Sequence, residues 1–162
     1  MTEHSDEKPP VIFDASPYLR LFIDKDGRWF QNGAEIIHPH VYAYFNSVLE
    51  RTGDGEYRVR IGREQCRVEV EDAPFVVTAV LSHNEDGVFI RLNDGTEEPF
   101  DPRHFWVGAA NVPYCEVKQG RFFARFSRPA YYRIAEHIVN EGDRFYFTLG
   151  GERVLVRSVG AR

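Results

Sequence analysis

The sequence has little cysteine, no long apolar run and no excess of basic residues. Its two cysteines, Cys66 and Cys115, lie in stretches where apolar residues alternate, so we interpret them as small, buried apolar side chains. No segment approaches the roughly 18 consecutive apolar residues of a membrane-spanning helix. The opening residues MTEHSDEKPP also lack the apolar stretch of a secretory signal. We therefore expect a cytoplasmic, reduced protein that does not enter a membrane.

The charge balance and the histidine spacing exclude two further classes of partner. Lys and Arg number 20 against 25 Asp and Glu, a net charge of −5, and no basic stripe is visible. Because duplex binding requires such a stripe, we expect no nucleic-acid partner. His38-Pro39-His40 suggests a metal ligand pair, but zinc needs three or four ligands and no further ligand has suitable spacing nearby. The sequence therefore predicts no metal site and no cofactor.

Aromatic residues are abundant, at 14% of the chain, and they favour strands. Apolar residues alternate in short segments separated by Gly-containing turns, which is typical of hairpins. Two segments have helical spacing instead, and each begins at a proline, Pro39 or Pro129. Their apolar stripes are Val41, Tyr44, Phe45, Val48 and Leu49 in the first segment, and Tyr131, Ile134, Ala135, Ile138 and Val139 in the second. The pattern predicts an α+β fold with mainly antiparallel sheet.

Two hairpin–helix–hairpin segments share several features. Gly-Arg-aromatic-aromatic occurs at 27–30 and 120–123, and Gly-x-Glu occurs at 62–64 and 150–152. We interpret them as a degenerate internal repeat, with an additional β segment between the copies. The alternative is that any hairpin–helix–hairpin segment has this pattern. The predicted organisation is a disordered tail over 1–14, a first repeat lobe over 15–72, a connecting β segment over 73–112 and a second repeat lobe over 113–162.

Three motifs carry a resemblance to a known family. They are VEVEDAPFVV at 68–77, DGRWF at 26–30 and YCEVKQGRFFARFSRPAYYRI at 114–134. With its acidic VED-x-PF signature, the chain resembles the bacterial DUF1285 family, a domain of unknown function. The resemblance implies an α+β fold with two related lobes and a signalling or regulatory role. It implies no established activity, and it supplies no catalytic residues.

Adjacent carboxylates and an aromatic loop are the first candidate site. Glu71 and Asp72 end a strand, where they either cap backbone N–H groups or take part in a ligand or catalytic site. His104 and Trp106 lie in a charged, aromatic loop that forms either a pocket wall or a cover for the sheet end. Tyr114 is the next aromatic candidate along the chain, and we expect a pocket between the repeats that is lined by Trp106, Tyr114 and the arginines described next.

Three arginines form the second candidate site. Arg121 and Arg125 share a strand face because they are four residues apart, and Arg128 follows near the start of the second helix. A helix N-terminus beside arginines favours an anion. The alternative is a solvated strand face whose arginines pair with nearby carboxylates.

We therefore expect a non-catalytic ligand-binding or regulatory module that binds a small anionic ligand or a protein partner. The alternative is an enzyme acting on a small acidic metabolite, with Glu71 or Asp72 as base and His104 nearby; it requires these groups to converge on one substrate atom. A homodimer formed through an exposed edge strand is a third hypothesis.

Overall fold

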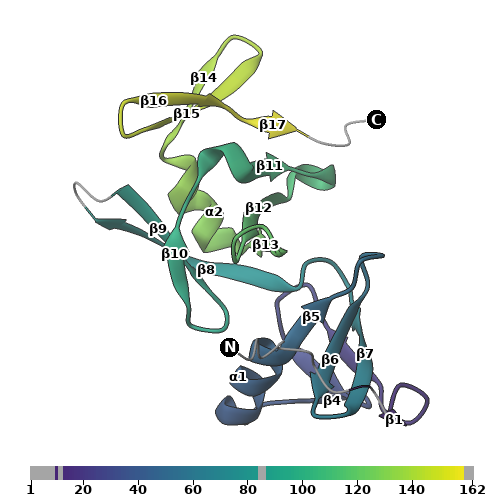
Figure 1. Cartoon of the computed structure of the whole chain (residues 1–162). Coiled ribbons are helices and arrows are strands. Elements are labelled where there is room, and N and C mark those ends of the chain that lie inside the picture. The colour runs from purple at the N-terminus through teal and green to yellow at the C-terminus, as the bar shows by residue number, and fades with distance from the viewer. Residues whose placement is uncertain (1–9, 11–12, 84–86, 159–162) are drawn as a thin grey trace, which may run out of the picture. The chain divides into compact units, whose positions relative to one another are not determined.

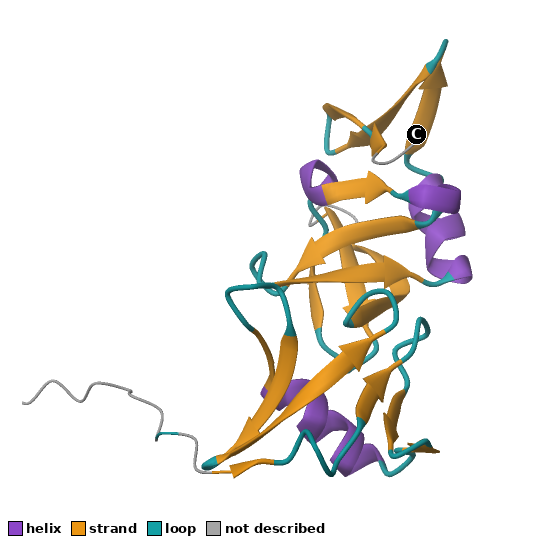
Figure 2. Cartoon of the chain, turned by 90° about the vertical axis from the view of Figure 1, so that its right-hand side faces the viewer, coloured by secondary structure: helices purple, strands orange, loops and turns teal. Residues whose placement is uncertain are grey.

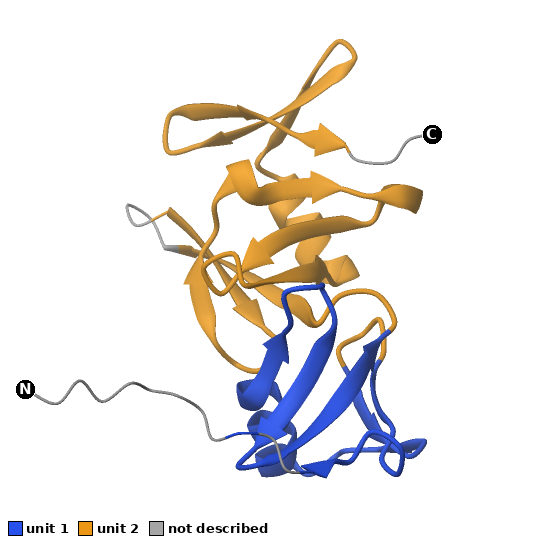
Figure 3. Cartoon of the chain, turned by 45° about the vertical axis from the view of Figure 1, so that its right-hand side comes forward, with its two compact units in different colours: residues 1–23, 28–70 blue, residues 24–27, 71–162 orange. Residues whose placement is uncertain are grey.

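The chain forms two compact units in a computed structural model that describes residue 10 and residues 13–83 and 87–158. The N-terminal unit comprises Met1–Ile23 and Arg28–Val70, and the C-terminal unit comprises Asp24–Gly27 and Glu71–Arg162 (Figure 3). In both units strands predominate over helices (Figure 2). This agrees with the α+β fold and mainly antiparallel sheet expected from the sequence.

The N-terminal unit is built on one seven-stranded sheet (Figure 1). Its strands are β1 (Phe13–Asp14), β2 (Leu21–Ile23), β3 (Trp29–Gln31), β4 (Ala34–Glu35), β5 (Leu49–Arg51), β6 (Tyr57–Ile61) and β7 (Glu64–Val70). They lie in the order β4-β3-β2-β7-β6-β5, and β1 also pairs with β7. The β1 and β2 strands run parallel to β7, whereas the other pairs are antiparallel.

One helix, α1 (Pro39–Val48), packs on this sheet against β6. The His38 side chain caps the helix by accepting a hydrogen bond from the backbone N–H of His40 at 3.3 Å. The buried Trp29 ring stacks on Phe45 and donates its indole N–H to Asn46 Oδ1 at 3.0 Å. Asn46 is itself buried, and its amide nitrogen donates to a backbone carbonyl one turn earlier. Both polar ends of this buried amide are therefore satisfied.

The C-terminal unit contains a second seven-stranded sheet. Its strands are β8 (Phe75–His83), β9 (Gly87–Leu92), β10 (Glu97–Pro99), β11 (Phe105–Val107), β12 (Pro113–Val117), β13 (Phe122–Phe126) and β17 (Arg157–Ser158). They lie in the order β10-β9-β8-β13-β12-β11-β17. Two short 3₁₀ helices, η2 (Pro102–His104) and η3 (Ala109–Asn111), flank β11.

A helix and a smaller sheet complete this unit. The helix α2 (Arg128–Ala135) is capped by Ser127 and packs against β8. The smaller sheet is an antiparallel meander of β14 (Ile138–Glu141), β15 (Arg144–Leu149) and β16 (Glu152–Leu155). Buried phenylalanines join the two sheets, because the Phe105 ring meets Phe126 and Phe147 edge-on with centroids 5.5 and 5.0 Å apart. Such pairs add to the hydrophobic stabilisation of a core.

An internal repeat is not confirmed by the topology. Each of the two segments does contain a hairpin, a helix and a second hairpin, in that order. In the N-terminal unit, β7 of the second hairpin pairs with β2 of the first, so both hairpins share one sheet. In the C-terminal unit the second hairpin, β15 and β16, belongs to a sheet separate from β12 and β13.

Three boundaries differ from those expected. The first helix ends at Val48 and the second at Ala135, so residues predicted to continue each stripe lie in strands instead. Leu49 begins β5 and Ile138 begins β14, where each pairs with the neighbouring strand. At the N-terminus, two residues of the expected tail form β1, and the backbone N–H of Phe13 donates to the Arg63 carbonyl. Residues 1–9, 11 and 12 of that tail lie outside the described residues.

Candidate functional site

Three predicted site residues form a row across the large sheet of the C-terminal unit. Trp106 of β11 lies opposite Tyr114 of β12, which in turn lies opposite Arg125 of β13. Their immediate neighbours in sequence, such as Cys115 and Ala124, point into the core and are fully buried. Because side chains alternate along a strand, the row belongs to the opposite face of the sheet.

Asp72 interacts with two residues of this row. It accepts hydrogen bonds from the Tyr114 hydroxyl at 2.8 and 2.9 Å and forms an ion pair with Arg125 Nη1 at 3.0 Å. Burial, and then the hydrogen bond to the Asp72 carboxylate, raise the pKa of Tyr114 to about 12. The Arg125 and Asp72 side chains are 29% and 27% exposed, so solvent screens the ion pair only in part. An anion bound here would therefore compete with Asp72 for the guanidinium.

Aromatic rings surround this polar group. Trp106 stacks on Tyr114 with centroids 5.7 Å apart, and Phe123 meets the Tyr114 ring edge-on at 5.9 Å. Gly108 lies so close that a Cβ atom there would be 2.8 Å from a Tyr114 ring carbon. We call Asp72, Trp106, Tyr114, Phe123 and Arg125 the Asp72 cluster. Its side chains hold one another in place.

The other four predicted residues have different partners. Glu71 accepts a hydrogen bond from the Lys25 backbone N–H at 2.7 Å, which is a capping role. His104 Nδ1 lies 3.5 Å from Glu116. Arg121 donates to the Lys118 carbonyl, and Arg128 is the first residue of α2. The structure thus brings together Asp72, Trp106, Tyr114 and Arg125, whereas the interactions found for Glu71, His104 and Arg121 involve other residues.

A buried ion pair that the sequence did not indicate lies at the β12–β13 turn. Lys118 Nζ is 2.8 Å from Asp94 Oδ2 and lies over the Phe75 ring, 4.9 Å from its centroid. The side chains of Lys118 and Asp94 are only 17% and 9% exposed. Burial raises the pKa of Asp94, but hydrogen bonds from Lys118 and Thr96 outweigh it and leave the pKa below its usual value. The pair therefore links the turn between β9 and β10 to the turn between β12 and β13.

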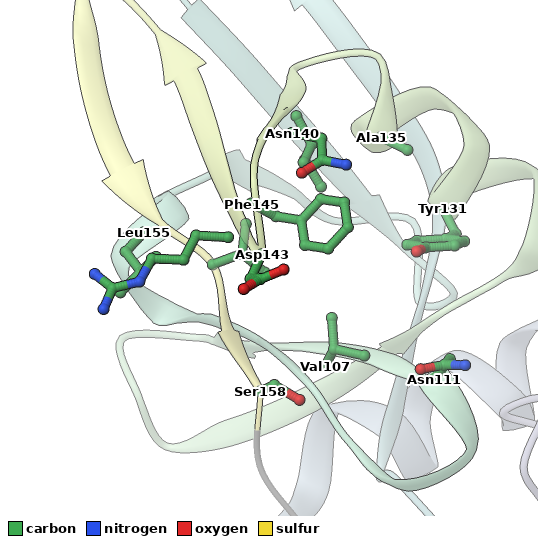
Figure 4. Close-up of a pocket in the computed structure, with 12 residues that line it drawn as sticks. Val107, Asn111, Tyr131, Ala135, Asn140, Asp143, Phe145, Leu155 and Ser158 are labelled. Atoms are coloured by element: carbon green, nitrogen blue, oxygen red, sulfur yellow. The ribbon is translucent and has the colours of Figure 1, made fainter. Parts of the chain in front are cut away.

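The C-terminal unit also contains a cavity of about 850 Å³ (Figure 4). It is bounded by α2, the small meander sheet, and the chain around β11, η3 and β17. We call it the α2 cavity. Its walls are Val107, Asn111, Tyr131, Ala135, Ile138, Asn140, Asp143, Arg144, Phe145, Leu155, Val156 and Ser158.

None of the eight predicted site residues lines the α2 cavity. Its walls come from segments between positions 107 and 158 that are brought together only by tertiary packing. Tyr131, Ala135 and Ile138 were expected to form the apolar face of a helix. Such a face is typical of core packing, so the pattern did not indicate that these residues line a cavity. No local sequence signal could have identified this cavity.

Comparison with known proteins found similarity to one family. Residues 9–73 match the family model described as "Domain of unknown function (DUF1285), N-terminal domain". Over these residues the chain is similar to the N-terminal domain of the DUF1285 family. The resemblance expected from the sequence is thus confirmed at the level of the family, and the two related solved structures below carry the same family name.

Two crystal structures of DUF1285 family proteins share the fold. One, from Silicibacter pomeroyi DSS-3, is 23% identical with a TM-score of 0.69, and the match covers 93% of this chain and 84% of that chain. The other, from Shewanella baltica OS155, is 23% identical with a TM-score of 0.61, and the match covers 75% of this chain and 94% of that chain. No curated protein is significantly similar to this chain.

The N-terminal unit has a polar cleft of its own, of about 640 Å³. Asp14 and Asp54 lie on it, and each accepts a hydrogen bond from a neighbouring hydroxyl, of Ser16 and Thr52. These hydrogen bonds lower the pKa of both carboxyl groups. The carboxylates therefore stabilise turns. The Asp72 cluster lies largely, and the α2 cavity wholly, beyond the residues that match the family model.

Within the described ranges, no three His, Cys, Asp or Glu side chains are grouped as a metal site would require. In the same residues, no helix has the length and apolarity needed to cross a membrane.

Proposed function

We propose that this protein is a non-catalytic ligand-binding module whose α2 cavity takes a small, largely apolar molecule. The cavity itself carries the proposal. At about 850 Å³ it falls within the usual range for small-molecule sites, and its walls combine apolar and aromatic side chains with a few polar groups.

Exposed apolar surface at the cavity supports the proposal. Phe145 and Leu155 both line it, and they are 51% and 44% exposed. Removing apolar surface from water is favourable by about 25 cal/mol per Å². A ligand that covered these two side chains would remove them from water.

The chemistry of the walls favours binding over catalysis. Among the described lining residues, Asp143 and Arg144 carry the charged side chains, and neither histidine nor cysteine is present. The predicted enzyme alternative gains no support from the contacts, because Glu71, Asp72 and His104 have different partners.

A regulatory effect follows from the position of the cavity. In β14–β16 the one buried residue is Phe147, so little apolar burial holds this meander in place. A ligand touching both α2 and β15 would add burial between them. Bound ligand should therefore slow amide hydrogen exchange in β14–β16, a change that a partner protein could detect.

The test uses N-phenylnaphthylamine, a neutral dye that fluoresces in apolar sites. Ala135→Trp fills the α2 cavity from the helix side, and we expect it to weaken dye binding at least tenfold. Ala43→Trp is the matched control, since Ala43 is an exposed residue of α1. It should leave the affinity unchanged.

A second variant keeps the test valid if Ala135→Trp does not fold. Phe145→Ala removes an exposed aromatic wall, so it should fold normally and weaken the dye about fivefold, as expected for one aromatic contact. Circular dichroism and melting temperature confirm folding of each variant. Dye binding that is absent, or equally strong in wild type, Ala135→Trp and Phe145→Ala, would refute the proposal.

A further inference from the structure

We infer that the ligand of the α2 cavity carries a cationic amine head, which pairs with Asp143. This inference rests on the proposed function and specifies the ligand class. Asp143 lies in the turn between β14 and β15, and its carboxylate points into the space between Phe145 and Val107 (Figure 4). A single carboxylate thus enters a cavity whose walls are mainly apolar.

Neither Asp143 nor Arg144 forms an ion pair with any residue that the structure describes. Arg144 and Phe145 are adjacent in β15, so their side chains leave opposite faces of the meander. The Phe145 ring points into the cavity, so alternation places the start of the Arg144 side chain on the other face of β15.

The opposite face of the meander offers Arg144 a set of neighbours. Tyr146 alternates with Phe145 and therefore lies on that face, and the Arg153 guanidinium is 3.9 Å from the centroid of its ring. Arg153 also pairs with Glu141. Arg153 is thus held on the face of the meander opposite Phe145, whereas Arg144 also lines the cavity together with Asp143.

The remaining polar and aromatic walls suit a cation. Asn111, Asn140 and Ser158 provide neutral oxygen atoms that accept hydrogen bonds from an ammonium group. Tyr131 and Phe145 provide ring faces, which attract a cation through the negative charge on the π system. A cavity built for an anion would instead direct several donors at one point.

The experiment measures how three probes with one naphthyl body displace N-phenylnaphthylamine. The probes are naphthylethylamine, naphthylethanol and naphthylacetate, which differ in charge. We expect the amine to bind about fivefold more tightly than the alcohol, the upper range for a partly exposed ion pair. The preference should diminish as salt concentration rises.

Asp143→Asn keeps the shape of the side chain and removes its charge. We expect this variant to bind amine and alcohol equally, with alcohol affinity as in wild type. Arg144→Gln is the matched control, and it should retain the amine preference.

The outcomes separate this inference from the proposed function. Wild-type preference for naphthylacetate, especially if lost in Arg144→Gln, would overturn the amine assignment and leave the cavity as a binding site. Equal binding of all three probes would do the same. Failure of every probe, together with dye binding that ignores Ala135→Trp, would instead overturn the proposed function.

Discussion

Tyr114 donates its hydroxyl hydrogen to both oxygens of Asp72, a residue 42 positions earlier in the chain. The same carboxylate holds Arg125 of the neighbouring strand. Asp72 thereby ties the segment before β8 to β12 and β13 on one face of the sheet. The contact organises the C-terminal unit, and each partner can be tested separately.

Removing the Tyr114 hydroxyl should destabilise the protein. Tyr114→Phe keeps the ring that stacks on Trp106 but removes both hydrogen bonds to Asp72, so we expect a loss of about 1–2 kcal/mol. Urea unfolding followed by circular dichroism measures it. Tyr132→Phe is the control, because Tyr132 is 64% exposed and should change the free energy of unfolding by less than about 0.5 kcal/mol. Equal stability of Tyr114→Phe and wild type would show that solvent replaces the bond without cost.

Tyr114 should also be visible in alkaline titration. Its pKa of about 12 lies above the ordinary value of 10.0, so the neutral phenol is the form that the fold favours. Its contribution to stability is therefore complete below pH 10 and is lost as the pH rises through 12. Ultraviolet difference titration should lose a component near pH 12 in Tyr114→Phe. In Asp72→Asn the midpoint should fall, because the carboxylate charge no longer opposes ionisation; an unchanged midpoint would assign the whole shift to burial.

Gly108 should tolerate no side chain. A Cβ atom at this position would be 2.8 Å from Tyr114 Cε2 and must displace that ring from Trp106 and Asp72. We expect Gly108→Ala to lower the free energy of unfolding by about 1–3 kcal/mol, as overpacking usually does. Gly53→Ala is the matched control, since no atom lies within 4 Å of the added Cβ there. If both variants were equally stable, the ring would have room to shift.

The sequence predicted which helices and hairpins form better than it predicted the residues at which they end. Hairpins and helices followed from alternation and from the prolines at 39 and 129, because these are local properties of the chain. Ile138 and Val139 also fit the helical spacing of α2, yet they form β14 because pairing with β15 provides hydrogen bonds and contact with Phe147. Tertiary pairing therefore decided where the helix ended.

The residues that are buried on α1 also differ from those that the sequence pattern predicted. Val41 and Tyr44 were expected in the apolar stripe of the helix, but they are exposed, and the polar Asn46 is buried. The reason is the Trp29 indole N–H, which needs an acceptor inside the core and finds it in Asn46. An apolar count along the helix cannot anticipate a hydrogen bond to a residue 17 positions away.

For the candidate site, the sequence indicated individual residues but not which of them interact with one another. Asp72, Trp106, Tyr114 and Arg125 were all named, yet that Asp72 holds Arg125 depends on strand register, which the sequence did not specify. The anionic ligand stays a prediction, and the α2 cavity required the tertiary structure.

The buried Lys118–Asp94 pair should make the largest single contribution tested. Lys118→Met leaves the Asp94 carboxylate nearly buried without its cation, so we expect a loss of about 3 kcal/mol at neutral pH. The lowered pKa of Asp94 means that its charged form contributes stability above about pH 4, and that this contribution is lost as the pH falls through the folded-state pKa. The difference between Lys118→Met and wild type should therefore shrink in acid, as measured by urea unfolding at neutral pH and at about pH 3.

The matched variants are Lys25→Met and the double variant Lys118→Met/Asp94→Asn. Lys25 is an exposed turn residue, so its loss should leave stability unchanged. The double variant should recover part of the stability lost in Lys118→Met, because a neutral amide costs less to bury than an unpaired carboxylate and still accepts the hydrogen bonds from Thr96. If the double variant were as unstable as Lys118→Met, the loss would come from the missing contact of the lysine with Phe75 rather than from an unpaired charge.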